Sequence, residues 1–284
     1  MEPKSVVATD LHPAFGTLVS GIDLNEALSP AAIAELRGLF DERSMLVFRQ
    51  PGLELAAQDR LCRALIGDES DDSVGRAPRY ISNLEPEALA PYGRLLFHVD
   101  MMWHPRPVQV LSLYAMHVDT AAATTSLTSG VAAWERLPQD LRDRVEHLHA
   151  RHVTGQVYRR GGDDLLRPER ERERSTVTPI AFTHPRTGRT VLFVSQQMTQ
   201  EVVELPPEES EQLLEELFAH LYAPDLVYEH TWRDGDLVVF DNVALQHARG
   251  DVERDGPART LRKVIAPVPS DLSDADRPTF AGAR

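Results

Sequence analysis

Short strand-like segments dominate this sequence and do not alternate regularly with helical ones. Each segment is rich in apolar residues, and most are bounded by Gly, Pro, Asp or Asn, as strands usually are. The segments are residues 44–50, 79–84, 108–118, 190–198, 235–242 and 260–268. A doubly wound parallel sheet would need strands and helices in regular alternation. The pattern therefore predicts a mainly β fold, a β-sandwich or jelly roll with flanking helices packed outside it.

Helical patterning is confined to a few segments, which begin near Pro30, Leu55, Ser129 and Pro206. Ser29 is suited to cap the first helix, because a serine oxygen can accept from a free N–H of the first turn. Pro138 is expected to break or restart the third, since proline interrupts a helix interior. No internal repeat or linker divides the chain, so we expect a single domain over residues 1–284.

Charge and cysteine content exclude several classes of protein. The chain carries 30 basic and 44 acidic residues, a net charge of −14, which disfavours nucleic acid or a membrane surface as a partner. Cys62 is the only cysteine, so neither an internal disulfide nor a cysteine-based metal cluster is expected. Because no signal-peptide pattern and no apolar run of about 20 residues is present, we expect a cytoplasmic protein. A homo-oligomer is compatible with the sequence.

Two segments differ in composition from the rest of the chain. Residues 159–176 are highly charged and nearly devoid of apolar side chains. They form either a solvated loop or a mobile active-site loop that orders over a bound substrate, and the composition leaves both interpretations open. Residues 269–284 are expected to form a poorly ordered tail.

The tripeptide His-Val-Asp occurs twice, at residues 98–100 and 117–119. Residues two apart on a β-strand project from the same face, so either copy could offer a histidine and a carboxylate to one metal ion. With 11 histidines in the chain, about one such spacing is expected by chance. At least one copy is therefore expected to have no role in metal binding, and the tripeptide alone does not identify it.

A third feature lies downstream, where His247 ends an apolar stretch and residues 258–266 run back as its expected antiparallel partner. By period-two alternation, one face of that returning strand carries Arg259 and Lys263, and the other carries Arg262. If His247 points into a barrel, Arg259 points in beside it across the hairpin. Arg262 and Arg254 are the competing arginines, because a register slip of one residue exchanges the two faces.

Two histidines and one carboxylate on one face of an octahedral ion leave three positions open, a pattern typical of non-haem iron(II) oxygenases. The open positions admit a chelating cosubstrate and dioxygen. A fixed cation is also needed to neutralise the far carboxylate of the cosubstrate, and the planar fork of an arginine suits that bidentate task.

With these residues in place, the chain resembles the TauD/TfdA (taurine dioxygenase) family of Fe(II)- and 2-oxoglutarate-dependent dioxygenases. The resemblance implies a double-stranded β-helix (jelly-roll, cupin-like) core, with Fe(II), 2-oxoglutarate and O2 as cofactor and cosubstrates. It is carried, in the family's order, by "FGTLVSGIDL", "LVFRQ", "YISNLE", "HVD", "TSGVAAWERLP", "HPRTGR", "WRDGDLVVFDN", "QHARG" and "ARTLRKV".

The resemblance also implies a role for each matching residue. Counted at the family's spacing, His98 leads to Thr125, a cosubstrate-binding threonine, whereas the same count from His117 leads to Arg144 inside a predicted helix. The implied iron ligands are His98, Asp100 and His247. Arg259 and Thr125 match the residues that bind 2-oxoglutarate, and Lys263 matches a position where some members carry an arginine that meets an anionic substrate.

The sequence departs from the family pattern near these residues. "AATT" replaces the common "GGDT" before the third helix, Val243 replaces the arginine of "DNR", and the stretch before His98 is short. The segment Met101–Trp103 forms either an apolar wall of the pocket or part of the core, and both interpretations remain open. The candidate substrate-binding residues are Lys263, Arg94, Met102, Trp103, Tyr158, Arg159 and Arg262, with His104 and Arg160 nearby.

We therefore expect a dioxygenase that hydroxylates an unactivated C–H bond of a small anionic substrate, such as an amino-acid-like molecule or natural-product intermediate. Succinate and CO2 are the expected co-products, and Asp100 argues against halogenation. The alternatives are a non-catalytic metal- or ligand-binding jelly roll, a metal-dependent hydrolase or isomerase, and desaturation or another oxidation at the same iron centre.

Overall fold

The computed structural model describes residues 5–68, 79–85, 88–154 and 174–267. The predicted tail at 269–284 lies outside the described residues, and so does most of the charged segment 159–176. The last three residues of that segment, 174–176, are described, and Ser175 and Thr176 begin a strand.

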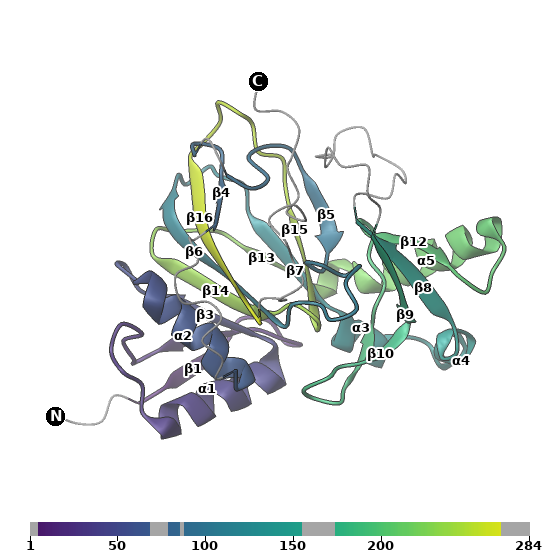
Figure 1. Ribbon diagram of the computed structural model, residues 1–284, viewed down its shortest axis with the longest axis horizontal. Helices are drawn as coiled ribbons and strands as arrows, with labels where there is room; N and C mark the ends of the chain where they lie inside the picture. The colour runs from purple at the N-terminus through teal and green to yellow at the C-terminus, as the bar shows by residue number, and fades with distance from the viewer. Residues whose placement is uncertain (1–4, 69–78, 86–87, 155–173, 268–284) are drawn as a thin grey trace.

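Two mostly antiparallel β-sheets enclose the core of the fold (Figure 1). The larger sheet has, in spatial order, β1 (Val7–Asp10), β2 (Thr17–Ser20), β3 (Met45–Arg49), β14 (Asp236–Asp241), β6 (Val110–Val118), β16 (Arg259–Ala266) and β4 (Arg79–Ser82). The smaller sheet has β13 (Val227–His230), β7 (Thr125–Ser129), β15 (Leu245–Arg249) and β5 (Leu95–His98). This double-stranded β-helix, or jelly roll, confirms the predicted mainly β fold.

Alternating side chains divide each strand between the barrel interior and an outer layer. Val47 of β3 packs inside the barrel with Leu127 of β7 and Leu245 of β15, so the two sheets share one interior cluster. Leu46, the neighbour of Val47, faces outward into a separate cluster with the helices. Because both faces are covered, β3 reads as a continuous apolar run rather than as a polar and apolar alternation.

Helices α1 (Pro30–Arg43) and α2 (Leu55–Ile66) cover the outer face of the larger sheet (Figure 1). Leu36 and Phe40 of α1 and Leu61 of α2 are buried there against the sheet. The serine cap forms as predicted, since the Ser29 side chain accepts a hydrogen bond from Ala32 N–H at 3.2 Å.

A second helical layer lies beyond the smaller sheet. It contains α3 (Gly130–Arg136), α4 (Gln139–Val145) and α5 (Pro207–Leu221), followed by the 3-10 turn η2 (Pro224–Leu226). These helices share a core with a small sheet and a hairpin, formed by β12 (Thr199–Val202), β8 (His149–Val153), β9 (Ser175–Pro179), β10 (Ala181–Thr183) and β11 (Thr190–Leu192). The predicted break at Pro138 is confirmed, because α3 ends at Arg136 and α4 begins at Gln139.

The expected hairpin between the His247 strand and the Arg259 strand is wrong. β15 pairs with β5 and β7 in the smaller sheet, whereas β16 pairs with β6 and β4 in the larger one. The intervening residues 250–258 cross from one sheet to the other, as connections in a jelly roll do. The predicted alternation of β16 is nevertheless confirmed, since Leu261 packs in the interior cluster and Val264 against the outer one.

The packing of α1 gives a stability prediction. Replacing Leu36, which is 1% exposed, by alanine is expected to lower the free energy of unfolding by about 2–5 kcal/mol, because the deletion leaves a cavity under the helix. Chemical denaturation measures the change. Glu35→Ala on the exposed side of the same helix is the control and is expected to stay within about 0.5 kcal/mol of the parent protein. Equal losses in both variants would contradict the assigned packing.

Candidate metal centre

Two histidines face each other across neighbouring strands of the smaller sheet. His98 is the last residue of β5, and the antiparallel register places His247 of β15 directly opposite it. Directly opposed residues in an antiparallel pair share one face of the sheet. The two imidazole rings accordingly lie with centroids 4.1 Å apart, and both are buried.

Asp100 completes the group from a turn rather than from the strand. β5 ends at His98, and Met101 adopts a left-handed conformation with φ of 60°. This turn brings Oδ1 of Asp100 to 3.4 Å from Nε2 of His98 and 3.9 Å from Nε2 of His247. Potential ligand atoms of the three residues all lie within 4.8 Å of one another.

The donor set and its orientation fit a ferrous ion. Nδ1 of His98 donates to the Leu96 carbonyl at 2.7 Å, which leaves the lone pair of Nε2 free to face Asp100. His98, Asp100 and His247 therefore present two imidazole nitrogens and one carboxylate oxygen on one side of a shared point. Such a triad, with the remaining positions open, is the donor pattern of non-haem iron(II) oxygenases.

The electrostatic surroundings keep Asp100 and His247 in the protonation states that metal binding requires. Burial alone would raise the pKa of the Asp100 carboxyl, but the Lys263 ammonium and the two imidazoles hold it well below its usual range. Burial, together with nearby His98, holds the pKa of His247 well below its usual value. The centre therefore combines an ionised carboxylate with a neutral His247 imidazole, as a metal site requires.

Lys263 reaches the same centre from the opposite sheet. Its Nζ forms an ion pair with Oδ2 of Asp100, while Oδ1 faces the histidines. Lys263 and Arg259 both project into the barrel, as the sequence predicted, since Lys263 contacts Asp100 and Arg259 contacts Thr125 there.

Arg259 lies inside the barrel in contact with neutral partners. Its Nη2 donates to Thr125 Oγ1 at 3.1 Å, and its Nε donates to the Ala123 carbonyl at 3.1 Å. Trp232, which the sequence analysis did not single out, also donates to Thr125 Oγ1, at 3.0 Å. Burial lowers the pKa of Arg259 to about 9, with a further contribution from the neighbouring Arg249. Among the described residues, no carboxylate pairs with Arg259.

Arg262 does not join this centre. It lies on the other face of β16, where its Nε donates to Gln58 at 2.8 Å and its Nη2 donates to the Leu53 carbonyl at 2.7 Å. Its guanidinium also covers the Tyr114 ring. Arg262 thus joins the sheet to the α2 region, whereas Arg259 lies inside the barrel beside Thr125.

The side chains of the apolar residues that follow Asp100 differ in how exposed they are. Met102 is fully buried in a core cluster with Val131 and Phe193. Trp103 is 9% exposed, and the guanidinium of Arg174 lies over its ring at 5.6 Å. Arg94 directly precedes β5. Tyr158, Arg159 and Arg160 lie outside the described residues.

The second His-Val-Asp copy, residues 117–119, lies at the end of β6 and has a structural role there. The His117 side chain is 59% exposed and lies 4.0 Å from the exposed Asp234 carboxylate. Asp119 accepts a hydrogen bond from Ala258 N–H at 2.7 Å and so joins the end of β6 to the start of β16. Within the described part of the chain, the triad at His98 is the only cluster with metal-binding geometry.

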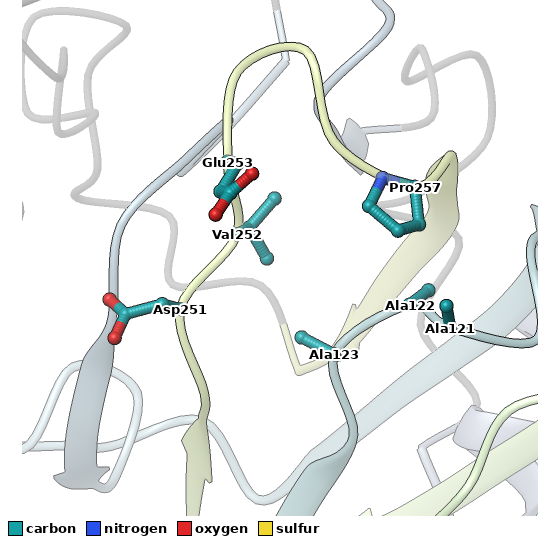
Figure 2. A pocket seen from close by; sticks show the side chains of 7 residues that line it. All are labelled: Ala121, Ala122, Ala123, Asp251, Val252, Glu253 and Pro257. Atoms are coloured by element: carbon teal, nitrogen blue, oxygen red, sulfur yellow. The ribbon is translucent and has the colours of Figure 1, made fainter.

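A surface cavity of ≈ 220 Å³ opens close to Arg259 (Figure 2). It lies between residues 121–123 and the loop at 251–257, and two acidic residues, Asp251 and Glu253, are among those that line it. Ala123 belongs to this wall, while its carbonyl accepts from Arg259.

The fold and the triad define a mononuclear non-haem iron enzyme that activates dioxygen. The chain belongs to the family described as "Taurine catabolism dioxygenase TauD, TfdA family", whose model matches residues 8–265. It is therefore an Fe(II)- and 2-oxoglutarate-dependent dioxygenase, with His98, Asp100 and His247 as the metal triad. No described helix has the length and apolar character needed to cross a membrane.

Similar proteins include a dioxygenase and a synthase. The alpha-ketoglutarate-dependent 2,4-dichlorophenoxyacetate dioxygenase of Cupriavidus pinatubonensis is 30% identical, over 91% of this chain and 96% of that protein. Pentalenolactone F synthase of Streptomyces avermitilis is 28% identical, over 89% of this chain and 90% of that protein. Alpha-ketoglutarate is a synonym of 2-oxoglutarate.

Solved structures share the fold along nearly the whole chain. The structure of AAD-2 in complex with Mn(II) and N-oxalylglycine matches with a TM-score of 0.75 and 24% identity, over 92% of this chain and 96% of that one. A taurine dioxygenase from Burkholderia xenovorans matches with a TM-score of 0.74 and 23% identity, over 98% and 97%. At these identities the likeness establishes the architecture alone.

The triad predicts that one histidine substitution weakens metal binding and that another leaves it unchanged. His247→Ala is expected to weaken Co(II) binding by more than about 100-fold. Loss of a residue that only hydrogen-bonds to a metal ligand already weakens binding by up to about 100-fold, and loss of a ligand itself should cost more. Calorimetric titration of the metal-free protein measures the affinity. His117→Ala, in the second His-Val-Asp copy, is the control and should bind Co(II) as the parent does. An unchanged affinity in His247→Ala would rule out the triad.

Proposed function

We propose that this dioxygenase hydroxylates an unactivated C–H bond of a small anionic substrate, an amino-acid-like compound or a natural-product intermediate. The balanced reaction is R–H + O2 + 2-oxoglutarate → R–OH + succinate + CO2. One oxygen atom enters the product and the other enters succinate. The observation that carries the proposal is a buried guanidinium without a carboxylate partner, placed in the same barrel as the triad.

Arg259 supplies the site for the distal carboxylate of 2-oxoglutarate. A buried charge is costly unless it is paired, and the partners of Arg259 among the described residues are neutral oxygens. A carboxylate ligand would provide the missing countercharge through a bidentate contact. Thr125 is fixed beside it by the indole N–H of Trp232, so its hydroxyl is oriented before the cosubstrate binds.

When bound, Fe(II) supplies open coordination positions and the redox chemistry that activates dioxygen, and 2-oxoglutarate supplies two electrons. The protein's own residues bind, orient and exclude water. Arg259 and Thr125 hold one end of 2-oxoglutarate so that its keto acid end can reach the triad. The buried setting of Arg259 and His247 strengthens these electrostatic contacts by keeping water away.

Lys263 supports the choice of an anionic substrate. Its ammonium lies beside the triad, and Asp100 is the carboxylate that it contacts there. A substrate carboxylate approaching the centre would meet this positive charge on the side of β16. Two similar enzymes are named for carboxylate substrates, 2,4-dichlorophenoxyacetate and (S)-phenoxypropionate, which agrees with a cation at this position. Arg94 and Trp103 are the remaining described candidates for contacts with the rest of the substrate.

The rival functions make different predictions for the same sample. A non-catalytic metal-binding jelly roll would bind Fe(II) but would form no succinate, and a hydrolase or isomerase would need no 2-oxoglutarate. Desaturation would consume 2-oxoglutarate and yield a product two hydrogen atoms lighter than the substrate. Mass spectrometry of the product therefore separates hydroxylation from desaturation, and the succinate assay separates both from the other rivals.

Replacing Arg259 by glutamine is expected to weaken 2-oxoglutarate binding by about 10- to 150-fold, because a charge-assisted hydrogen bond contributes about 1.5–3 kcal/mol. Anaerobic titration of the Fe(II)-loaded protein with 2-oxoglutarate, followed through the visible charge-transfer band of the chelate, gives the dissociation constant. Admission of oxygen followed by a succinate assay then tests turnover.

Arg254→Ala is the matched control for Arg259→Gln, because Arg254 lies outside the barrel over the Tyr92 ring. It is expected to leave the titration unchanged. A normal dissociation constant in Arg259→Gln would sink the assigned cosubstrate site. Absence of both the band and succinate in the parent protein, across a panel of substrates, would sink the proposed activity.

Lys263→Met is expected to raise the KM for an anionic substrate by about 10-fold or more, since one charge-assisted contact is lost. The panel would include 2,4-dichlorophenoxyacetate, phenoxypropionate, taurine and amino acids, with neutral amides of the same compounds for comparison. The dissociation constant of 2-oxoglutarate should change much less. Equal KM values for the acid in the parent and in Lys263→Met would contradict the pairing with the substrate anion.

A further inference from the structure

The backbone of Asp100 is held by a side chain that is distant in sequence. Asn242 follows β14 in the turn that leads into β15, and it is fully buried. Its Oδ1 accepts a hydrogen bond from Asp100 N–H at 2.9 Å, and its Nδ2 donates to the Asp100 carbonyl oxygen at 3.0 Å. The amide thus pairs with both backbone groups of the metal ligand, as a neighbouring strand would.

The same amide also holds the far end of the segment that begins at Asp100. Nδ2 of Asn242 donates a second hydrogen bond to the Val108 carbonyl at 2.8 Å, and Asn242 N–H donates to the Gln109 carbonyl at 2.8 Å. Both N–H groups of the side chain are therefore used. Removal of this fully bonded buried amide would leave its backbone partners without hydrogen bonds, which carries a free-energy cost.

The turn that carries Asn242 is itself fixed by Asp241. The carboxylate Oδ1 of Asp241 accepts hydrogen bonds from Val243 N–H and Ala244 N–H, each at 3.0 Å. His184 lies 3.0 Å from the same carboxylate, and Arg186 forms an ion pair with it. This buried network leaves Asn242 little freedom to move away from Asp100.

Asp100 needs such support because the sheet does not provide it. β5 ends at His98, and the chain turns at Met101 with a positive φ. The two histidines are fixed by the β5–β15 register, whereas Asp100 lies beyond that pairing. We propose that Asn242 is a positioning residue of the metal centre, which holds the Asp100 turn in its metal-binding conformation before the ion arrives.

The proposal is tested with Asn242→Ala and its affinity for Co(II) alone, without cosubstrate or substrate. The affinity is expected to fall about 10- to 100-fold, the range found when outer-shell partners of metal ligands are lost. The visible d–d absorption of bound Co(II) is expected to shift, because the Asp100 oxygen is displaced from its metal-binding position. Neither readout depends on turnover, so a failed activity assay leaves this test intact.

Asn25→Ala is a closely matched control. Asn25 also exchanges two hydrogen bonds with backbone, since its Nδ2 donates to the Gly52 carbonyl at 3.1 Å and its Oδ1 accepts from Glu54 N–H at 2.9 Å. It lies in the loop before α1, away from the triad. Asn25→Ala is expected to keep the parent Co(II) affinity and spectrum even where it lowers thermal stability.

A third variant separates hydrogen bonding from side-chain volume. Asn242→Asp keeps the shape but replaces Nδ2 with an acceptor that faces the carbonyls of Asp100 and Val108. It is expected to bind Co(II) at least as weakly as Asn242→Ala. Parent-like affinity and absorption in either folded variant would overturn the proposal.

Hydrogen exchange keeps the proposal testable if both variants fail to fold. In the parent protein, the Asp100 amide is expected to be protected already in the metal-free state, because Asn242 Oδ1 accepts from it. Addition of Zn(II) should then add little protection at this amide. An Asp100 amide that exchanges freely until metal is added would show that the turn is organised by the ion and would overturn the role of Asn242.

Discussion

The metal centre depends on one antiparallel register, the pairing of His98 on β5 with His247 on β15. Side chains alternate between the two faces of a strand, so a slip of one residue would turn one imidazole out of the barrel. β15 is also paired with β7 on its other side, and β7 begins with Thr125. β15 therefore positions, through its two separate pairings, both His98 and the threonine beside Arg259.

The interior of the barrel and the surface of the molecule have opposite electrostatic character. The chain has a net charge of −14, yet Arg259 and Arg249 are buried and Lys263 lies beside the triad. Arg249 donates to the carbonyls of the segment before β5, and burial lowers its pKa to about 10. A bound anion thus meets cationic side chains inside the barrel, where charges interact strongly because the medium has low polarity.

Local patterns in the sequence predicted more than long-range pairings did. The period-two alternation of β16 separated Arg259 from Arg262, because that periodicity is a property of the strand alone. The same pattern says nothing of which strand lies beside it, and so β15 and β16 were wrongly joined in a hairpin. The sequence predicted no role for Trp232 or Asn242 for a related reason. Each acts through hydrogen bonds to residues over a hundred positions away. Met102 shows a further limit, as an apolar residue beside a ligand has the same signature whether it lines a pocket or fills the core.

The ion pair between Lys263 and Asp100 affects how many donor atoms the protein offers. Because the ammonium engages Oδ2, only Oδ1 is directed at the imidazoles, and the carboxylate is set for one-point rather than two-point attachment. A six-coordinate ion held through three protein atoms keeps half of its shell for exogenous molecules. β16 contributes no donor atom of its own, but through Lys263 it limits the number of oxygen atoms that Asp100 offers to the ion.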